Sequence, residues 1–204
     1  MKPQKNAIYE AIEGRRSIRR FEQRPVEPAV LHKMLQAASR APSAHNRQPW
    51  RWVIVQSIDR RVALAQAMAQ ELARDRSDDG DDPLEIQRDV ERSIGRIRQS
   101  PIIVVLCLTM EAMDRYPDPD RNQAEYVMAV QSTAMAGQNL MLLAHAEGLG
   151  SCWMCAPLFS PQSVHEVFDV PQDWIPQGLI LLGYPSTSGR DRVRKPLEEV
   201  VQWI

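Results

Sequence analysis

Two arginine clusters lie close to opposite ends of the 204-residue chain, and these side chains are the best candidates for binding chemistry. Residues 15–20 read RRSIRR and residues 190–195 read RDRVRK. An arginine carries a planar set of donors that stays charged at any working pH and suits a phosphate monoester, which is nearly a dianion. If folding joins the two clusters, they form a phosphate site; a solvated basic stretch is the alternative for each.

A second polar stretch, residues 41–50, reads APSAHNRQPW. Two prolines bracket the polar residues, which is typical of a loop. The amides of Asn46 and Gln48 can both donate and accept hydrogen bonds, so they suit a heterocycle edge with alternating C=O and N–H groups.

A glycine turn, EGLG at residues 147–150, is the third candidate feature. The preceding residues, 130–146, are apolar on nearly all sides, which predicts a buried helix at the centre of the core. Glycine can end such a helix and lets main chain approach a ligand closely. An ordinary helix–turn–strand joint is the alternative.

Together these features predict a bound redox coenzyme, because a phosphate site and a heterocycle site occur without an acid–base pair or a nucleophile triad. The absence of G-x-G-x-x-G and G-x-x-x-x-G-K-[ST] disfavours a Rossmann site and a P-loop. Cys152 and Cys155 form a C-x-x-C inside an apolar strand pattern, so we expect two buried structural thiols rather than a redox pair. The sequence has no second ligand pair for zinc.

The hydrophobic pattern predicts helices and strands in alternation, and so an α+β or α/β layered sheet. The predicted helices cover residues 6–14, 29–41, 58–74, 86–97, 121–146 and 161–168. The predicted strands cover residues 51–55, 101–109, 151–155 and 178–183, and the second of these is expected to be buried on both faces.

Two further segments stand apart from this pattern. The acidic run DRSDDGDDP at residues 75–83 predicts a solvated tip or a mobile lid between two helices, without the spacing of a calcium loop. The apolar tail LEEVVQWI at 197–204 is expected to pack either on a partner subunit or on its own core.

Composition narrows the class of protein. With 44% hydrophobic and 25% charged residues, the chain is expected to form one globular domain over residues 1–204. A net charge of −1 argues against a nucleic-acid or acidic-membrane partner. No run of 18 apolar residues and no signal-peptide pattern occurs, so we expect a cytoplasmic protein without a membrane partner.

Four motifs in a fixed order make the chain resemble the FMN-dependent nitroreductase family. They are RRSIRxF, APSAHNRQPW, QNLMLLAHAEGLGSCW at 138–153, and LILLGYP followed by RxRKPLEEVV. The resemblance implies an α+β three-layer sandwich with a central mixed, mainly antiparallel sheet wrapped by helices. It also implies a domain-exchanged homodimer with FMN at the interface. NADH or NADPH would reduce the FMN, and an electron-poor nitroaromatic, quinone or enone-like substrate would reoxidise it.

The resemblance also assigns site residues. The residues expected on the FMN phosphate and ribityl side are Arg15, Arg16, Ser17, Arg19, Arg192 and Arg194. Those expected to reach the flavin or ribityl chain from the second subunit are Pro42, Ser43, Asn46 and Gln48. Those expected to present backbone N–H groups to the flavin are Leu149, Gly150, Cys152, Trp153, Met154 and Cys155. The residues expected to contact the substrate are His45, for which a solvated loop position is the alternative, and Asp75.

Within the family, three segments look most like the FMN domain fused to the γ-glutamyl ligase of the deazaflavin coenzyme factor 420. They are MDRYPD at 113–118, SCWMCAPLF and WIPQGLILLGYP. This resemblance implies reduction of a dehydro precursor of the deazaflavin, although the chain has no ligase domain and its acidic run disfavours a polyanionic substrate. A non-catalytic flavin-binding protein is the remaining alternative.

Overall fold

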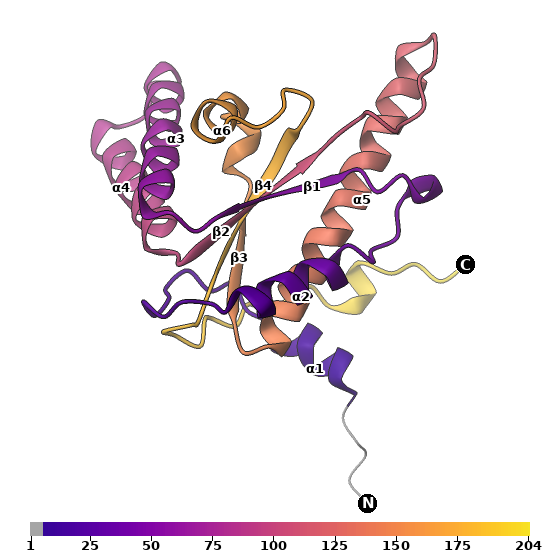
Figure 1. The fold of residues 1–204 in the computed structure, drawn as a ribbon, viewed down its shortest axis with the longest axis horizontal. Helices are drawn as coiled ribbons and strands as arrows, with labels where there is room; N and C mark the ends of the chain where they lie inside the picture. The colour runs from indigo at the N-terminus through magenta and orange to yellow at the C-terminus, as the bar shows by residue number, and fades with distance from the viewer. Residues whose placement is uncertain (1–5) are drawn as a thin grey trace, which may run out of the picture.

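The computed structural model describes residues 6–204, which form a four-stranded antiparallel sheet covered by helices on both faces (Figure 1). The strands are β1 (Trp50–Val55), β2 (Ile102–Leu108), β3 (Gly150–Met154) and β4 (Ile175–Gly183). Their order across the sheet is β1-β2-β4-β3, so β3 is an edge strand. One isolated parallel bridge joins Ser17 to Ser151. The predicted α+β class and mainly antiparallel sheet are confirmed.

All six predicted helices are present. They are α1 (Ala7–Gly14), α2 (Pro28–Ala38), α3 (Ile58–Asp78), α4 (Pro83–Gln99), α5 (Pro119–Ala146) and α6 (Pro161–Phe168). Short 3-10 turns are η1 (Ala44–Asn46), η2 (Ala156–Leu158) and η3 (Leu197–Glu199). α2, α4, α5 and α6 have a proline in their first turn. There the fixed φ suits a helix and the missing N–H has no partner to lose.

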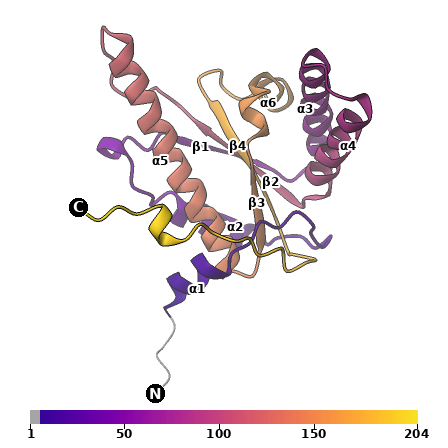
Figure 2. The same ribbon diagram turned by 180° about the vertical axis from the view of Figure 1, so that it is seen from behind.

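The strand β2 explains the three layers. All its residues are buried, as its uninterrupted apolar run predicts, and alternate side chains point to opposite faces. Ile103 and Val105 belong to a core cluster with side chains of α3, α4 and α6. Ile102 and Val104 belong to another with α2 and α5. Figures 1 and 2 show these two groups of helices on opposite faces of the sheet.

The helix α5 crosses one face of the sheet but is buried on one side only. Leu140, Met141 and Ala144 lie in the core, whereas 41% of Val127 and 39% of Met135 are exposed. The prediction of a helix buried all round is therefore wrong for the single chain, because the sheet covers one side of a cylinder. Neither α5 nor another helix in residues 6–204 has the length and apolar character needed to cross a membrane.

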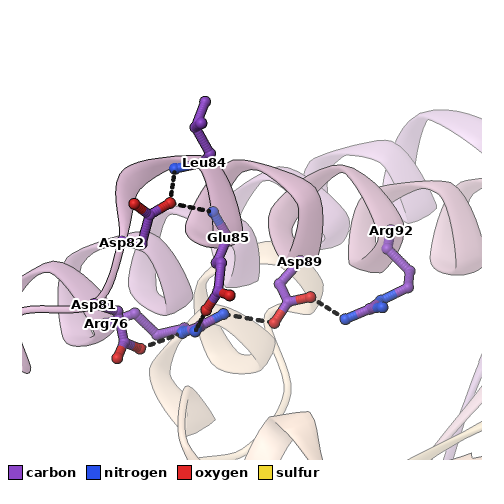
Figure 3. A network of polar contacts seen from close by, with 7 residues as sticks. All are labelled: Arg76, Asp81, Asp82, Leu84, Glu85, Asp89 and Arg92. Carbon is purple, nitrogen blue, oxygen red and sulfur yellow. Dashed lines mark hydrogen bonds and ion pairs between the residues drawn. The ribbon is translucent and has the colours of Figure 1, made fainter.

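The acidic run at residues 75–83 is more ordered in form than its composition predicts. α3 continues to Asp78, so the predicted helix end at Arg74 is wrong. Gly80, with φ of +79°, makes the turn, and Asp82 caps α4 by accepting hydrogen bonds from the backbone N–H groups of Leu84 and Glu85 (Figure 3). Mobility of this turn stays a prediction.

Arg76 holds the same turn together from inside the acidic run. Its guanidinium lies 2.6 Å from Asp81, 2.5 Å from Asp89 and 3.9 Å from Glu85, and Asp89 also pairs with Arg92 (Figure 3). These carboxylates raise the pKa of Arg76, and the hydrogen bond that its guanidinium donates to Asp81 contributes most. The α3–α4 turn therefore supplies its own counter-charge.

The apolar tail does not pack on the core of its own chain. Leu197 and Val200 are each 61% exposed and Trp203 is 87% exposed. α1 buries none of its residues, and an apolar groove of about 370 Å³ lies between α1, α2 and α5. Of the two expectations for residues 197–204, packing on the chain's own core is wrong, and packing on a partner subunit stays a prediction.

Candidate functional site

The arginine segment after α1 is fixed to the edge of the sheet by its apolar residues. The backbone N–H of Ile18 donates to the carbonyl of Ser151 at 2.9 Å, and Ile18 and Phe21 are buried in the core. Phe21 forms a second bridge, with Pro185. Two buried anchors in RRSIRRF leave the arginines between them directed away from the core, as the amphipathic pattern requires.

The C-terminal arginine loop approaches the same place from the end of β4. A Cβ on Gly189 would lie 2.8 Å from the Cβ of Arg16 and 2.9 Å from Ile18, so only glycine permits this close approach. The φ of Gly189 is +77°, which also favours glycine. Arg16 pairs with Asp191 at 3.1 Å. The two clusters that the sequence separates thus meet in the folded chain.

The meeting point is a cavity of about 480 Å³ whose lining is dominated by seven arginines. The lining residues are Arg15, Arg16, Ser17, Arg19, Arg20, Thr187, Gly189, Arg190, Arg192 and Arg194. Within residues 6–204, Asp191 is the one carboxylate paired with any of these arginines. Six positive side chains therefore face one cavity without a protein anion, an arrangement that favours an anionic ligand.

A second cavity, of about 230 Å³, adjoins the first. Arg15, Arg16 and Thr187 line both cavities. The glycine turn contributes Gly148, Leu149, Gly150 and Ser151, and His145 at the end of α5 completes one wall. The structure therefore places the predicted residues Leu149 and Gly150 beside the arginines.

Beyond Ser151, the strand β3 presents an edge. Trp153 directs its ring into the core, where it fills the space above Gly137 and Gly178: a Cβ on either glycine would lie within 2.8 Å of that ring. The ring of Trp153 is therefore largely used in packing, although the residue is only partly buried. Met154 is half-buried and Cys155 is exposed at the end of the strand.

The two thiols of the C-x-x-C differ in environment. Cys152 is buried and Cys155 is exposed, so the prediction of two buried thiols is wrong for Cys155, which lies one residue beyond the strand. Burial raises the pKa of the Cys152 thiol, and Arg19 opposes this shift. Burial raises the pKa of Cys107 to about 12. These two thiols therefore stay protonated near neutral pH and are poor nucleophiles.

The loop before β1 is separate from the arginine cavity within one chain. Pro42, Ser43, His45, Asn46 and Gln48 line neither of the two cavities. In Figures 1 and 2 this loop projects past α5 on the side away from α3 and α4.

The backbone of this loop is strained. The φ angles of His45, Asn46 and Gln48 are +47°, +55° and +49°. The Ser43 hydroxyl accepts from the backbone N–H of Gln48 at 3.0 Å, which helps to hold this shape. Left-handed backbone at three non-glycine residues is costly and is concentrated at functional sites.

Asp75 lies on α3 and lines a third cavity, of about 260 Å³. Met68 and Leu72 provide apolar walls, and Ala156 and Phe159 reach the same cavity from the segment that follows β3. Folding thus brings the predicted substrate residue close to the end of the strand predicted to face the flavin, although the two are far apart in sequence.

Comparison with known proteins places this arrangement in a family. The model of the Nitroreductase family matches residues 12–184. The chain belongs to the nitroreductase family. A Thermus thermophilus NADH dehydrogenase is 30% identical over 93% of this chain and 92% of its own length. A Methanothermobacter thermautotrophicus protein assigned as NADH dehydrogenase/NAD(P)H nitroreductase is 27% identical over 91% of this chain and 81% of that protein.

Solved structures agree with this placement. A protein from Desulfovibrio desulfuricans, assigned as a nitroreductase and solved in complex with FMN, is 25% identical, with a TM-score of 0.76 and 98% of each chain covered. A BluB-like flavoprotein from Clostridium difficile has a TM-score of 0.81 at 21% identity, covering 97% of this chain and 98% of that one. The second likeness concerns the fold alone.

In this nitroreductase-family chain, sequence reasoning missed several lining residues. Arg20 and Arg190 were visible as members of the two charged runs but were not singled out. Thr187, Gly189 and His145 carried no signal, because a single Thr, Gly or His in a loop or at a helix end has no pattern of its own. Their place depends on how β4 and α5 end next to the arginines.

Proposed function

We propose that this protein is an FMN-dependent oxidoreductase that passes electrons from NADH or NADPH to an electron-poor small molecule. The observation that carries the proposal is the cavity in which arginines from both ends of the chain meet, with one carboxylate partner among residues 6–204. Family membership and the FMN complex of a related protein support the identity of the anion.

The residues of the cavity suit a flavin mononucleotide. Arg15, Arg16, Arg19, Arg192 and Arg194 would hold the phosphate through charge-assisted hydrogen bonds. From there the edge of β3 leads toward Cys155, so main-chain groups of 152–157 would face the ring. When bound, FMN supplies the two-electron chemistry itself, and the protein binds and orients it.

The chain's own contribution to the chemistry would be electrostatic. Main-chain N–H groups at the end of β3 have fixed positions and stabilise negative charge where it develops on the ring. Asp75 and the apolar residues of the third cavity would shape the substrate position, because this cavity reaches Ala156, directly after the strand.

The proposed active form is a homodimer in which the second subunit completes the site. Pro42, Ser43, Asn46 and Gln48 are remote from the arginine cavity of their own chain, yet their loop is strained in the manner of a ligand-contacting segment. The exposed side of α5, the surface of α1 and the tail all expose apolar side chains, and such side chains are typical of a surface that a partner covers.

Two measurements test the proposal. FMN titrated into the purified protein should bind and give a flavin absorbance band, and anaerobic mixing with NADH or NADPH should bleach that band. A protein that takes up no FMN would refute the proposal. FMN uptake without bleaching by either donor would instead identify a flavin-binding protein without this activity.

The substrate is then found by reoxidation. Nitroaromatics, quinones and enones should restore the flavin band of the reduced protein. The dehydro precursor of the deazaflavin belongs in the same panel, since that precursor as the sole effective oxidant would identify the biosynthetic reductase. Light scattering during size-exclusion chromatography measures the mass, and a monomer at the concentrations of the assay would contradict the shared site.

A further inference from the structure

The loop of residues 42–48 keeps its strained backbone through contacts with other parts of the chain. His45, Asn46 and Gln48 have positive φ, a conformation that persists in residues other than glycine only where the surrounding structure enforces it. The hydrogen bond within the loop, from the N–H of Gln48 to the Ser43 hydroxyl, joins residues five positions apart. That bond shapes the loop but does not fix it relative to the sheet and α5.

The first contact from outside the loop comes from α5. Ser132 is 2% exposed, and its hydroxyl donates to the carbonyl of Met128 at 2.7 Å. The same oxygen accepts a hydrogen bond from the backbone N–H of Ala44 at 3.3 Å. Because its hydrogen is used on Met128, the hydroxyl can act toward Ala44 only as an acceptor. Ser132 thus ties the start of η1 to α5.

The second contact is an ion pair with the segment that follows β2. Nη2 of Arg47 lies 2.6 Å from Oδ1 of Asp114, and the two side chains are 38% and 41% exposed. The backbone N–H of Asp114 donates to the carboxylate of Glu125, a residue of α5 that is 4% exposed, at 3.3 Å. An ion pair this exposed contributes little to the stability of a whole domain. Its effect is therefore expected on the loop that carries Arg47.

The same segment reaches the end of the loop through Arg51 of β1. The guanidinium of Arg51 donates to the carbonyl of Gln48 at 3.2 Å and to that of Trp50 at 2.9 Å. It also lies 3.9 Å from Glu111, three residues before Asp114. The carboxylates of residues 111–114 are thus placed beside both arginines that flank Gln48, the last strained residue of the loop.

We propose that Arg47, Asp114 and Ser132 are positioning residues, which hold the loop of residues 42–48 in the shape that completes the flavin site of the partner subunit. This inference rests on the proposed function, because that function assigns Asn46 and Gln48 to the flavin. The three side chains act through the main chain of residues 44–48 and not by touching the ring.

The test is a double-mutant cycle read out as FMN affinity. Dissociation constants are measured by quenching of flavin fluorescence on the wild-type protein stripped of cofactor, on Arg47→Ala, on Asp114→Ala and on the double variant. Each single substitution should weaken FMN about threefold to fivefold, the upper range for a partly exposed ion pair. The double variant should lose no more than either single variant, because the loop is already released when one partner is gone.

Rescue and matched controls separate the ion pair from a general loss of structure. Exchanging the two residues, Arg47→Asp with Asp114→Arg, should restore FMN affinity to within about twofold of wild type. Arg92→Ala removes an ion pair with Asp89 on α4, on the side of the molecule away from the loop, and should leave FMN affinity unchanged (Figures 1 and 2).

Ser132→Ala gives a second route that involves no charge. It removes the acceptor for the N–H of Ala44 and should weaken FMN about fivefold, as expected for one lost hydrogen bond. This variant keeps the inference testable if Asp114→Ala does not fold by far-ultraviolet circular dichroism.

A spectroscopic signature distinguishes positioning from a loss of stability alone. At saturating FMN, the visible circular dichroism of the bound flavin reports the asymmetry of the groups around the ring. This signal should change in Arg47→Ala and Asp114→Ala and return in the exchange variant, with the mass of the dimer unchanged by light scattering. A substitution that only lowers Tm would leave the signal of the saturated protein as it is in wild type.

The outcomes separate this inference from the proposed function. Unchanged FMN affinity in the single variants, losses that add in the double variant, or a loss that the exchange does not reverse would each overturn the inference. An unchanged flavin signal or a fall to monomer mass in these variants would overturn it too. FMN binding by the wild type would leave the proposed function intact in all these cases, whereas a wild type that binds no FMN would refute both.

Discussion

The arginine cavity and the α3–α4 turn both bring charged side chains together, but they differ in whether the arginines have carboxylate partners. At the turn, Arg76 has three carboxylate neighbours, Asp81, Glu85 and Asp89. At the cavity, seven arginines gather and, within residues 6–204, only Arg16 has a carboxylate partner, Asp191. In the sequence, the turn is one charged run, whereas the cavity is built from two runs near opposite ends of the chain.

The difference teaches which charged run is available for binding. Arg76 is supplied with counter-charge by residues 5 to 13 positions away, so local folding is sufficient. The cavity arginines come from opposite ends of the chain and repel one another once gathered, so the arrangement is unfavourable until an external anion arrives. A cluster that the fold assembles without neutralising it is therefore the better candidate site.

The largest expected effect is the loss of flavin when the cavity is altered. Arg15→Ala or Arg194→Ala removes a charge-assisted contact worth about 1.5–3 kcal/mol, which corresponds to FMN binding weaker by about 10- to 150-fold. Fluorescence titration measures this change. Arg98→Ala, an exposed arginine of α4 outside the cavity, is the matched control. Unchanged FMN affinity in both cavity variants would remove the phosphate site.

A smaller effect is expected at the N-cap of α4, in the α3–α4 turn. Asp82→Ala removes the acceptor for the N–H groups of Leu84 and Glu85 and should lower the free energy of unfolding by about 1 kcal/mol. The corresponding fall in Tm is about 2–4 °C for a chain of this size. Calorimetry measures it, with FMN affinity unaffected. Asp78→Ala, which changes an acid without a cap contact, should not lower Tm.

Arg76→Gln tests whether the turn depends on its internal ion pairs. Tm should fall at low ionic strength because three carboxylates lose their shared cation. The difference from wild type should shrink in 1 M NaCl, where the screening length is only about 3 Å. FMN binding should be unchanged. A Tm difference that is the same at both salt concentrations would show that packing, and not charge, holds the turn.

The smallest effect is expected at the N-cap of α5, where Asp118 pairs with Arg121. Asp118 accepts from the backbone N–H of Arg121 and pairs with its guanidinium, and both contacts lower the pKa of Asp118. Because the folded pKa lies below the unfolded one, this stabilisation is present above about pH 4 and is lost as the pH falls through the folded pKa. Urea unfolding of wild type and Asp118→Asn between pH 2.5 and 6 should show the two curves converging at the acid end.

Local sequence was sufficient where a pattern has one structural meaning. The run PIIVVLCLT predicts β2 because an unbroken β-branched segment fits only a strand covered on both faces, and all seven residues of the strand are buried. Prolines mark the starts of four helices for an equally local reason. These features predict a layered sheet with helices before any tertiary contact is known, but they leave both α+β and α/β open.

The wrong predictions concern features that depend on neighbouring parts of the structure and not on the local sequence pattern alone. The run at 75–83 contains Arg76 among its acids, and composition alone does not show that this one cation organises the turn. The prediction that Cys155 is buried is wrong because the strand ends at Met154. The prediction that α5 is buried on all sides is wrong because an apolar sequence does not show that the sheet covers only one side.

By itself, the sequence determined the order of helices and strands, the two arginine runs and the glycine turn, since each depends on residues close together in the chain. Only the tertiary structure decided that Arg15 and Arg194 share one cavity, that His145 and Ser151 line its neighbour, and that Arg76 is already neutralised. Those outcomes depend on the pairing of residues 15–21 with β3 and on the path that follows β4, which are contacts between distant parts of the chain. Charge patterns show where arginines are, but the fold determines which of them have partners.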